Sequence, residues 1–387
     1  MTAAPDRDAA AMLRAATACA VMAAGMRDLA NAWMASEAST SPAAVALVQA
    51  ASTLPAFLLT LPAGLLSGTL GRRLLLAVQV LPVLVAALLL AQALAGQLHL
   101  PGLLALSLLG GLGAVGMAIA PQVPDDGARR GAFAANGLGT HVGLPLGLVA
   151  GGLLLGLVAP VATYAVVLGV AALPLAAWRH RPADALADPL VGALRAGLRY
   201  GRASREVHRV LWRAVLFFGG SSAAWALLPW VARRGQADAA ALYGGLLVAI
   251  GAGAFAGAMA LPWLRERLGI DRLMQLATSC AGAALLALAC LDARWRLLAL
   301  LPLFGAAWVA ALATLAGLTQ ALFPAWVRGR GLAIYVTAVA GAMTLGSVGW
   351  GLLAEVAGVR WALGAAALAV GVGALWGFRA LPGAPRL

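Results

Sequence analysis

The sequence predicts an all-α membrane protein with twelve transmembrane helices, on the basis of composition, hydropathy and charge placement. The chain has 387 residues, of which 63% are hydrophobic and only 11% charged, and its mean hydropathy is +0.91. Soluble domains carry about 25% charged residues, so this chain has too little polar surface to face water. Apolar runs of about 18 residues or more recur along the chain, each long enough to cross the hydrocarbon core as a helix. This composition excludes a secreted disulfide scaffold, a disordered protein and most enzymes with an aqueous cleft.

Charged residues and Pro/Gly-rich breaks between the apolar runs set the limits of the predicted helices. The first six cover residues 12–35, 43–67, 74–96, 101–120, 131–156 and 158–178. The second six cover residues 209–232, 239–262, 273–291, 297–322, 331–353 and 361–379. The longest polar stretch lies between these two sets. We therefore expect one six-helix bundle at 1–178, a cytoplasmic central loop at 179–208 and a second six-helix bundle at 209–387.

Arginine supplies all 27 basic residues and orients the predicted helices. With the N-terminus in the cytoplasm, 21 arginines fall in cytoplasmic segments and five in outer loops. This positive-inside bias predicts that both termini are cytoplasmic. It also accounts for the net charge of +13 without nucleic acid as a partner. The arginine-rich segment 189–209 fits two structures equally well, an amphipathic helix on the anionic leaflet or a solvated linker.

The two halves of the chain share an internal repeat at an offset of 200 residues. The matching positions are Pro124, Arg130, Gly131, Gly151 and Leu153 in the first half and Pro324, Arg330, Gly331, Gly351 and Leu353 in the second. Two six-helix units in the same orientation are related by a pseudo-twofold axis along the membrane normal. Glycines crowd the fifth and eighth predicted helices. Small residues there favour either sliding contacts between moving bundles or tight packing in a static one.

Few ionisable residues lie inside the predicted spans, and each is a functional candidate because charge is costly in the bilayer. Arg27, Asp28 and Asn31 share an arc of about 100° on the first helix. Asp28 is a candidate for proton uptake or cation binding beside Arg27, and a fixed structural ion pair is the alternative. His141, with Asn136 about a turn away, is the second titratable candidate because histidine titrates near neutral pH. The alternative is a buried histidine bonded to a carbonyl.

Polar and aromatic residues deeper in other helices are candidates for contact with a substrate. Gln49 shares a face of the second helix with Thr53, and Ser221 shares a face of the seventh with Trp225, by four-residue spacing. Trp308 and Tyr335 are candidates for stacking on an aromatic or extended substrate. Membrane aromatics that serve only as anchors or packing are the alternative.

The sequence has no motif for ATP hydrolysis, metal binding or catalysis. It contains no Walker loop, no His/Cys cluster and no Ser/His/Asp arrangement beyond chance. We therefore expect the protein not to be an enzyme and to need no cofactor or metal. Glu37 and Glu355, at the outer ends of predicted spans, are candidates for gating.

The loop after the second predicted helix contains a signature pattern. Gly64, Gly68, Gly71, Arg72 and Arg73 lie in the segment GLLSGTLGRR, which resembles the signature loop of the major facilitator superfamily. Gly68 stands where that loop usually has Asp, a residue thought to stabilise one gate conformation. The phrases SPAAVALVQAA and LPAFLLTLPAG resemble the enterobactin-exporter-like branch, also called transmembrane secretion effectors.

This resemblance covers nearly the whole chain and implies the major facilitator fold. It implies a proton-coupled exporter of a siderophore, drug or other metabolite, working by alternating access in the bacterial inner membrane. The implied partners are a small-molecule substrate, protons and the lipid bilayer, and the protein is expected to be a monomer. Because the first helix of each half lines the central cavity in this superfamily, the face that carries Arg27, Asp28 and Asn31 is expected to point at the substrate. Uncoupled or import-direction transport, lipid flipping and a non-transporting membrane scaffold are the alternatives.

Overall fold

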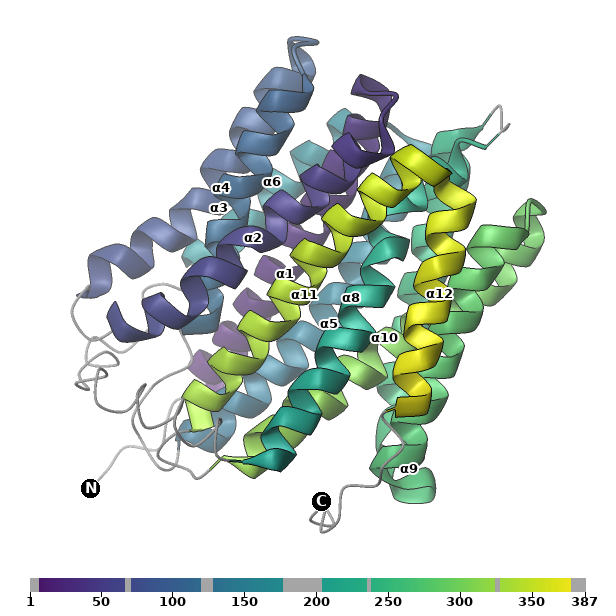
Figure 1. The fold of residues 1–387 in the computed structure, drawn as a ribbon. Helices are drawn as coiled ribbons and strands as arrows, with labels where there is room; N and C mark the ends of the chain where they lie inside the picture. The colour runs from purple at the N-terminus through teal and green to yellow at the C-terminus, as the bar shows by residue number, and fades with distance from the viewer. Residues whose placement is uncertain are drawn as a thin grey trace, which may run out of the picture.

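The structure is a computed structural model, and it describes residues 7–66, 71–119, 128–176, 204–234, 238–323 and 328–376. Every element in these ranges is a helix, and they contain no strand. The helices lie side by side in one bundle, with the α1–α2 and α11–α12 turns at the top of Figure 1. We call this end of the bundle the upper end and the opposite end the lower end.

The described helices follow the order expected from the hydropathy pattern. The N-terminal half contains α1 (Arg7–Ala38), α2 (Pro42–Leu66), α3 (Gly71–Leu94), α4 (Leu100–Ile119), α5 (Ala128–Leu157) and α6 (Pro160–Ala176). The C-terminal half contains α8 (Arg205–Ala232), α9 (Ala239–Cys290), α10 (Arg294–Leu322), α11 (Arg328–Ala357) and α12 (Val359–Trp376). Several helices begin a turn before their predicted limit, because hydropathy marks only the apolar part of a helix whose first turn carries arginine.

Prolines and glycines make the turns at the upper end short. Pro42 and Pro160 begin α2 and α6, at the helix position where a missing backbone N–H breaks no hydrogen bond. Gly358 separates α11 from α12 with a φ of 92°, a backbone conformation that glycine adopts without steric cost. Neighbouring helices therefore run antiparallel.

The long element α9 consists of two helices that meet at Gly269, where φ is 70° and ψ is 169°. A straight helix of 52 residues would measure about 78 Å, far more than a membrane. The second helix of α9 instead runs parallel to α8. Arg213, near the lower end of α8, donates to Asp271, and Arg234, just after its upper end, donates to the carbonyl of Leu288.

The predicted helices 239–262 and 273–291 correspond to these two parts of α9. The prediction of a loop between these two helices is wrong, because the intervening residues are helical up to the break at Gly269. Arginine and glutamate in this segment lower its hydropathy, but both residue types favour helix, so the charged stretch extends the two helices.

Five described helices are long and apolar enough to cross a membrane, namely α2, α8, α9, α10 and α11. Shorter apolar helical segments occur in α3, α4, α5, α6 and α12. The count of twelve membrane-crossing helices stays a prediction.

The order of contacts repeats between the two halves. α5 and α11 start at residues 128 and 328 and end at 157 and 357, which matches the 200-residue offset of the sequence repeat. α1 packs against α5 and α6, as α8 packs against α11 and α12. The halves meet where α2 packs on α11 and where α5 packs on α9. Most of the predicted central loop 179–208 lies outside the described residues.

The glycines of α5 and α9 serve two kinds of contact. Gly152 packs against Gly244 so closely that a Cβ at Gly152 would lie 2.6 Å from the Gly244 carbonyl oxygen, and this contact joins the two halves. Gly147 packs against the backbone of Met22 in α1, and Gly257 against Ala306 in α10. These two contacts lie inside one half each, so only part of the predicted glycine-rich surface lies between the halves.

Candidate functional site

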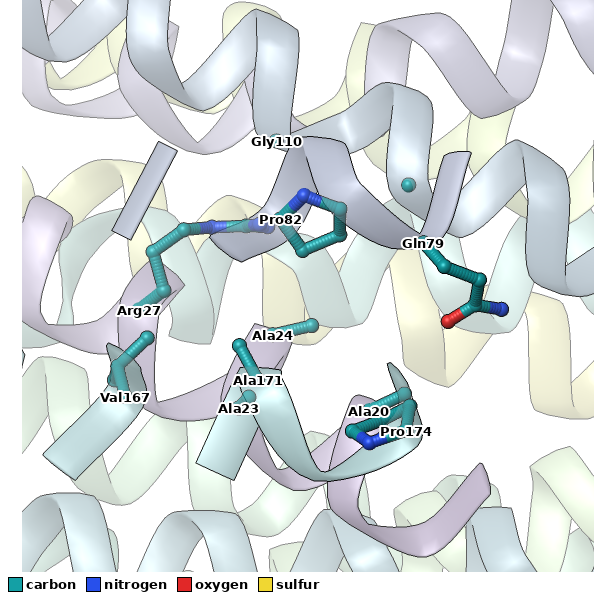
Figure 2. A pocket seen from close by; sticks show the side chains of 11 residues that line it. Ala20, Ala23, Ala24, Arg27, Gln79, Pro82, Gly110, Val167, Ala171 and Pro174 are labelled. Carbon is teal, nitrogen blue, oxygen red and sulfur yellow. The ribbon is translucent and has the colours of Figure 1, made fainter. Parts of the chain in front are cut away.

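Four helices of the N-terminal half, α1, α3, α4 and α6, surround a cavity of about 40 Å³ (Figure 2). The cavity is lined by Ala20, Ala23, Ala24, Arg27, Gln79, Pro82, Gly110, Gly113, Val167, Ala171 and Pro174. Small residues on three helices keep the space open. It lies inside the N-terminal half, because α3 and α6 make their main contacts with helices of that half alone.

The Arg27 side chain reaches from α1 to the edge of this cavity and is 5% exposed. Its Nε and Nη2 donate to Oδ1 of Asp28 at 3.1 and 2.8 Å. The guanidinium lies against Gly110 of α4, where an added Cβ would collide with it. The Asp28 side chain is 28% exposed, and Gly25, three residues earlier, faces open space. The ion pair therefore connects the interior of the N-terminal half with an open face of α1.

Asn31 continues this polar network one turn above Arg27. Its Nδ2 donates to Ser107 Oγ of α4 at 2.9 Å, and its Oδ1 accepts from Tyr164 Oη of α6 at 2.8 Å. All three side chains are buried. Sequence reasoning missed Ser107 and Tyr164, although each is an isolated polar group in an apolar run, where a partner is required.

The contacts of the α1 face lie within the N-terminal half, and its predicted contact with a substrate stays a prediction. Arg27 and Asn31 contact residues of α4 and α6. Only Asp28 is partly exposed. The reason is packing: small residues of α4 and α6 leave room for the polar side chains of α1, which helical periodicity alone does not reveal.

In the C-terminal half, the corresponding place between α8 and α10 is filled by aromatic rings. The Trp308 ring lies edge-to-face with Phe218 and Trp225, with centroids 4.9 and 5.3 Å apart. Phe217 and Phe304 also contact Trp308, with centroids 6.3 and 6.0 Å away. We call these five residues the aromatic cluster.

The structure brings three of the predicted substrate contacts to this cluster. Ser221 lies on α8 between Phe218 and Trp225 and is fully buried. Ser221 Oγ and Trp225 Nε1 have no hydrogen-bond partner among the described residues. Tyr335 is separate: its hydroxyl donates to the carbonyl of Leu312 at 3.4 Å and joins α11 to α10.

Side chains at the upper end link the two halves. Arg233, at the end of α8, donates from Nη1 to the carbonyl of Ser36 in α1 at 2.6 Å. Its guanidinium also lies 5.7 Å from the centre of the Trp33 ring. Trp33 stacks on Tyr243 of α9 with centroids 5.2 Å apart, and the Tyr243 hydroxyl donates to the carbonyl of Leu29.

A second link joins α11 to α2. Glu355 Oε2 accepts from Ser41 Oγ at 2.6 Å and from the backbone N–H of Ala43 at 3.3 Å. These groups form the N-terminus of α2, where the helix dipole favours a negative charge. Closer to the middle of the bundle, Thr53 Oγ1 and Thr344 Oγ1 share a hydrogen bond of 2.8 Å. The described contacts therefore hold the halves together at the upper end.

The remaining predicted residues have less structural context. Gln49 lies one turn above Thr53 on α2 and is half-buried. The backbones of His141 and Asn136 belong to α5, but their side chains lie outside the described residues. In the signature loop, Gly64 belongs to α2, and α3 begins with Gly71, Arg72 and Arg73. Gly68 and the side chains of the two arginines lie outside the described residues.

The sequence matches the family model of the transmembrane secretion effectors over residues 2–383. The chain belongs to the transmembrane secretion effector family. No curated protein sequence matches it. Membership makes the chain a transporter of the major facilitator superfamily, embedded in a membrane and acting on a small molecule.

Solved structures of transporters share the fold of this secretion effector. A bacterial homologue of the human lysosomal transporter Spinster has a TM-score of 0.73 at 14% identity, covering 97% of each chain. A mutant of the nucleoside transporter NupG has a TM-score of 0.72 at 11% identity, covering 95% of this chain and 98% of that one. The E. coli fucose:proton symporter FucP has a TM-score of 0.64 at 19% identity, covering 96% and 98%. At these identities the likeness establishes the fold alone.

Proposed function

We propose that this protein exports a small amphipathic molecule from the cytoplasm across the bacterial inner membrane in exchange for protons, by alternating access. The observation that carries the proposal is the Arg27–Asp28 pair: a carboxylate within α1, 28% exposed, held by an arginine that is 5% exposed. Among the described residues, the other acidic side chains lie close to helix ends or to the break at Gly269.

Protonation of Asp28 changes the energy of the polar network around it. The charged carboxylate accepts two hydrogen bonds from Arg27. Protonation removes the ion pair and leaves the guanidinium beside a neutral acid. Because buried electrostatic contacts are sensitive to such a change, the arrangement of α1 relative to α4 becomes dependent on the proton.

The upper-end links suit a gate that opens and closes. Arg233, Tyr243 and Glu355 reach across to α1 and α2 through hydrogen bonds and one ring stack. Such contacts are modest in energy, so a transporter can exchange them for water when the halves separate. In the orientation predicted from the arginines, this gate faces outward, and the described conformation is closed on that side.

The aromatic cluster supports an amphipathic substrate. Trp225 is partly exposed, whereas its Nε1 and the Ser221 hydroxyl are buried without a described partner. Aromatic faces with a few donors bind molecules that combine an apolar body with hydrogen-bond acceptors.

The test compares a deletion strain with strains that re-express the wild type, Asp28→Asn or Asp292→Asn. Untargeted mass spectrometry of cells and medium identifies a compound that accumulates in the deletion strain and returns to the medium with the wild type. Its flux is then measured in proteoliposomes with and without a pH gradient. Asp292 is the matched control, because it is an exposed aspartate paired with Arg360.

We expect Asp28→Asn to abolish the stimulation of export by the pH gradient, whereas Asp292→Asn retains it. Gradient-driven export that survives Asp28→Asn would remove Asp28 from coupling. If the wild type moves no compound in either direction, export is wrong, and the non-transporting scaffold takes its place.

A further inference from the structure

The cavity inside the N-terminal half has polar groups on opposite sides and no apolar side chain that fills it. Figure 2 shows the Arg27 side chain on one side and the Gln79 carboxamide on the other, with Ala23 and Ala171 between them. Both polar residues are buried, at 4% and 9% exposure. Burying such groups is costly unless they find hydrogen-bond partners.

Arg27 has donors to spare. A guanidinium carries five N–H groups, and the described bonds to Asp28 use only Nε and Nη2. Nη1 lies against Gly110, which offers no side chain, and has no hydrogen-bond partner among the described residues. A ligand that accepts hydrogen bonds from Nη1 therefore lowers the free-energy cost of burying the guanidinium.

The two prolines that line the cavity each leave a backbone carbonyl without its helical partner. Pro82 and Pro174 lie inside α3 and α6, and each lacks the N–H that would bond the carbonyl four residues earlier. The freed carbonyls belong to Val78 and Val170. The two proline rings themselves line the cavity, so both helix irregularities lie beside it. In membrane helices, ordered water is one of the partners that satisfies such carbonyls.

The volume of the cavity limits which ligands can fit. Its volume of about 40 Å³ exceeds the 10–15 Å³ or so that one water molecule requires, and leaves little room for an organic ligand. An anion is disfavoured because Asp28 already neutralises Arg27.

We propose that this cavity is a hydration site, which binds a small cluster of water molecules between Arg27 and Gln79. The water solvates the guanidinium from the side of α3 and α6, away from the space between the halves. Resting on the proposed function, this internal water keeps the Arg27–Asp28 pair hydrated, and so able to change its protonation, while the upper end is closed.

Ala171→Val tests the site by filling it. Ala171 is buried and lines the cavity, and its neighbours Val166, Val167 and Val170 show that α6 accepts valine. Ala172→Val is the matched control, because Ala172 is exposed on the outside of the same helix. X-ray hydroxyl-radical labelling in H₂¹⁸O marks side chains that touch bound water, and mass spectrometry locates the label.

In the wild type we expect labelling of Pro82, Val167 and Pro174 well above that of the fully buried Leu89 and Leu103. The label falls several-fold in Ala171→Val and stays at the wild-type level in Ala172→Val. Labelling of the cavity residues no higher than that of Leu89 would overturn the proposal. This readout needs no transport, so failure of the proposed proton exchange leaves its outcome unchanged.

The melting temperature in detergent gives an independent test of whether the cavity holds water. If Ala171→Val expels water from polar groups, the melting temperature falls below that of Ala172→Val. A dry cavity gains contacts when it is filled, so a rise in melting temperature relative to the control contradicts hydration.

Discussion

The two halves of this transporter fill the seam between their first and fourth helices in opposite ways. Between α1 and α4 lie Arg27, which is bonded to Asp28, and Asn31, which is bonded to Ser107 of α4 and Tyr164 of α6. Between α8 and α10 lie the rings of the aromatic cluster, with Trp308 at their centre. The repeat offset of 200 residues pairs Arg27 with Leu227 and Gly110 with Ala310.

This difference shows how one repeated architecture can divide two tasks. The stability of a polar seam depends on protonation and on water, since the energy of each polar side chain depends on its charged or hydrogen-bonded partners. An aromatic seam depends on shape and contact area, which pH does not alter. In the proposed function, the N-terminal seam senses protons and the C-terminal seam holds a rigid surface near the substrate.

The largest effect is expected in the aromatic seam. Trp308→Ala removes the ring that contacts four other aromatic residues and leaves a cavity, at a cost of about 3–5 kcal/mol in the free energy of unfolding. Calorimetric unfolding in detergent measures the loss. Trp361→Ala is the control, because Trp361 is 76% exposed, and should change stability little. Equal losses for the two variants would show that the cluster does not stabilise the C-terminal half.

A smaller loss is expected when the ion pair is broken in the polar seam. Arg27→Met leaves the Asp28 carboxylate without its partner, and we expect a loss of about 2 kcal/mol, reduced from the value for a fully buried pair by the partial exposure of Asp28. Leu227→Met, at the repeat-related position, is volume-conserving and should cost less than about 1.5 kcal/mol. A loss in Arg27→Met no larger than that in Leu227→Met would contradict the assignment of the ion pair as its cause.

The smallest effects are expected when serine is replaced by alanine in each of the two seams. Ser107→Ala removes the acceptor of the Asn31 amide and should cost about 1 kcal/mol. Ser221→Ala removes a buried hydroxyl without a described partner, and should be neutral or stabilising by up to about 1 kcal/mol. The two melting temperatures, measured under one set of conditions, should shift in opposite directions or differ clearly. A loss in Ser221→Ala as large as in Ser107→Ala would show that Ser221 has a bonded partner, such as water, in the folded protein.

Much of the candidate site could be predicted where it depends on spacing along one helix. The proximity of Arg27 to Asp28 and the shared face of Ser221 and Trp225 follow from helical periodicity. Their neighbours could not be predicted in this way. Tyr164 and Asn31 are 133 residues apart in the chain, and only the packing of α6 on α1 brings them within hydrogen-bond distance. The role of Glu355 as a cap for α2 likewise required the contact between α11 and α2, although its place at a span end had marked it as a gating candidate.

The sequence by itself determined the helical class, the order of the helices, the repeat and the family, because apolar run length, arginine placement and local motifs depend only on neighbours along the chain. The tertiary structure decided which way each helix face points: Arg27 into the N-terminal half, Trp308 into an aromatic cluster, and Arg233 across to Ser36. The physical reason is that every face of these helices is apolar enough for either lipid or protein. The rotation of each helix is therefore set by the close fit of small residues such as Gly110, Gly152 and Gly244 against their neighbours, and not by hydropathy.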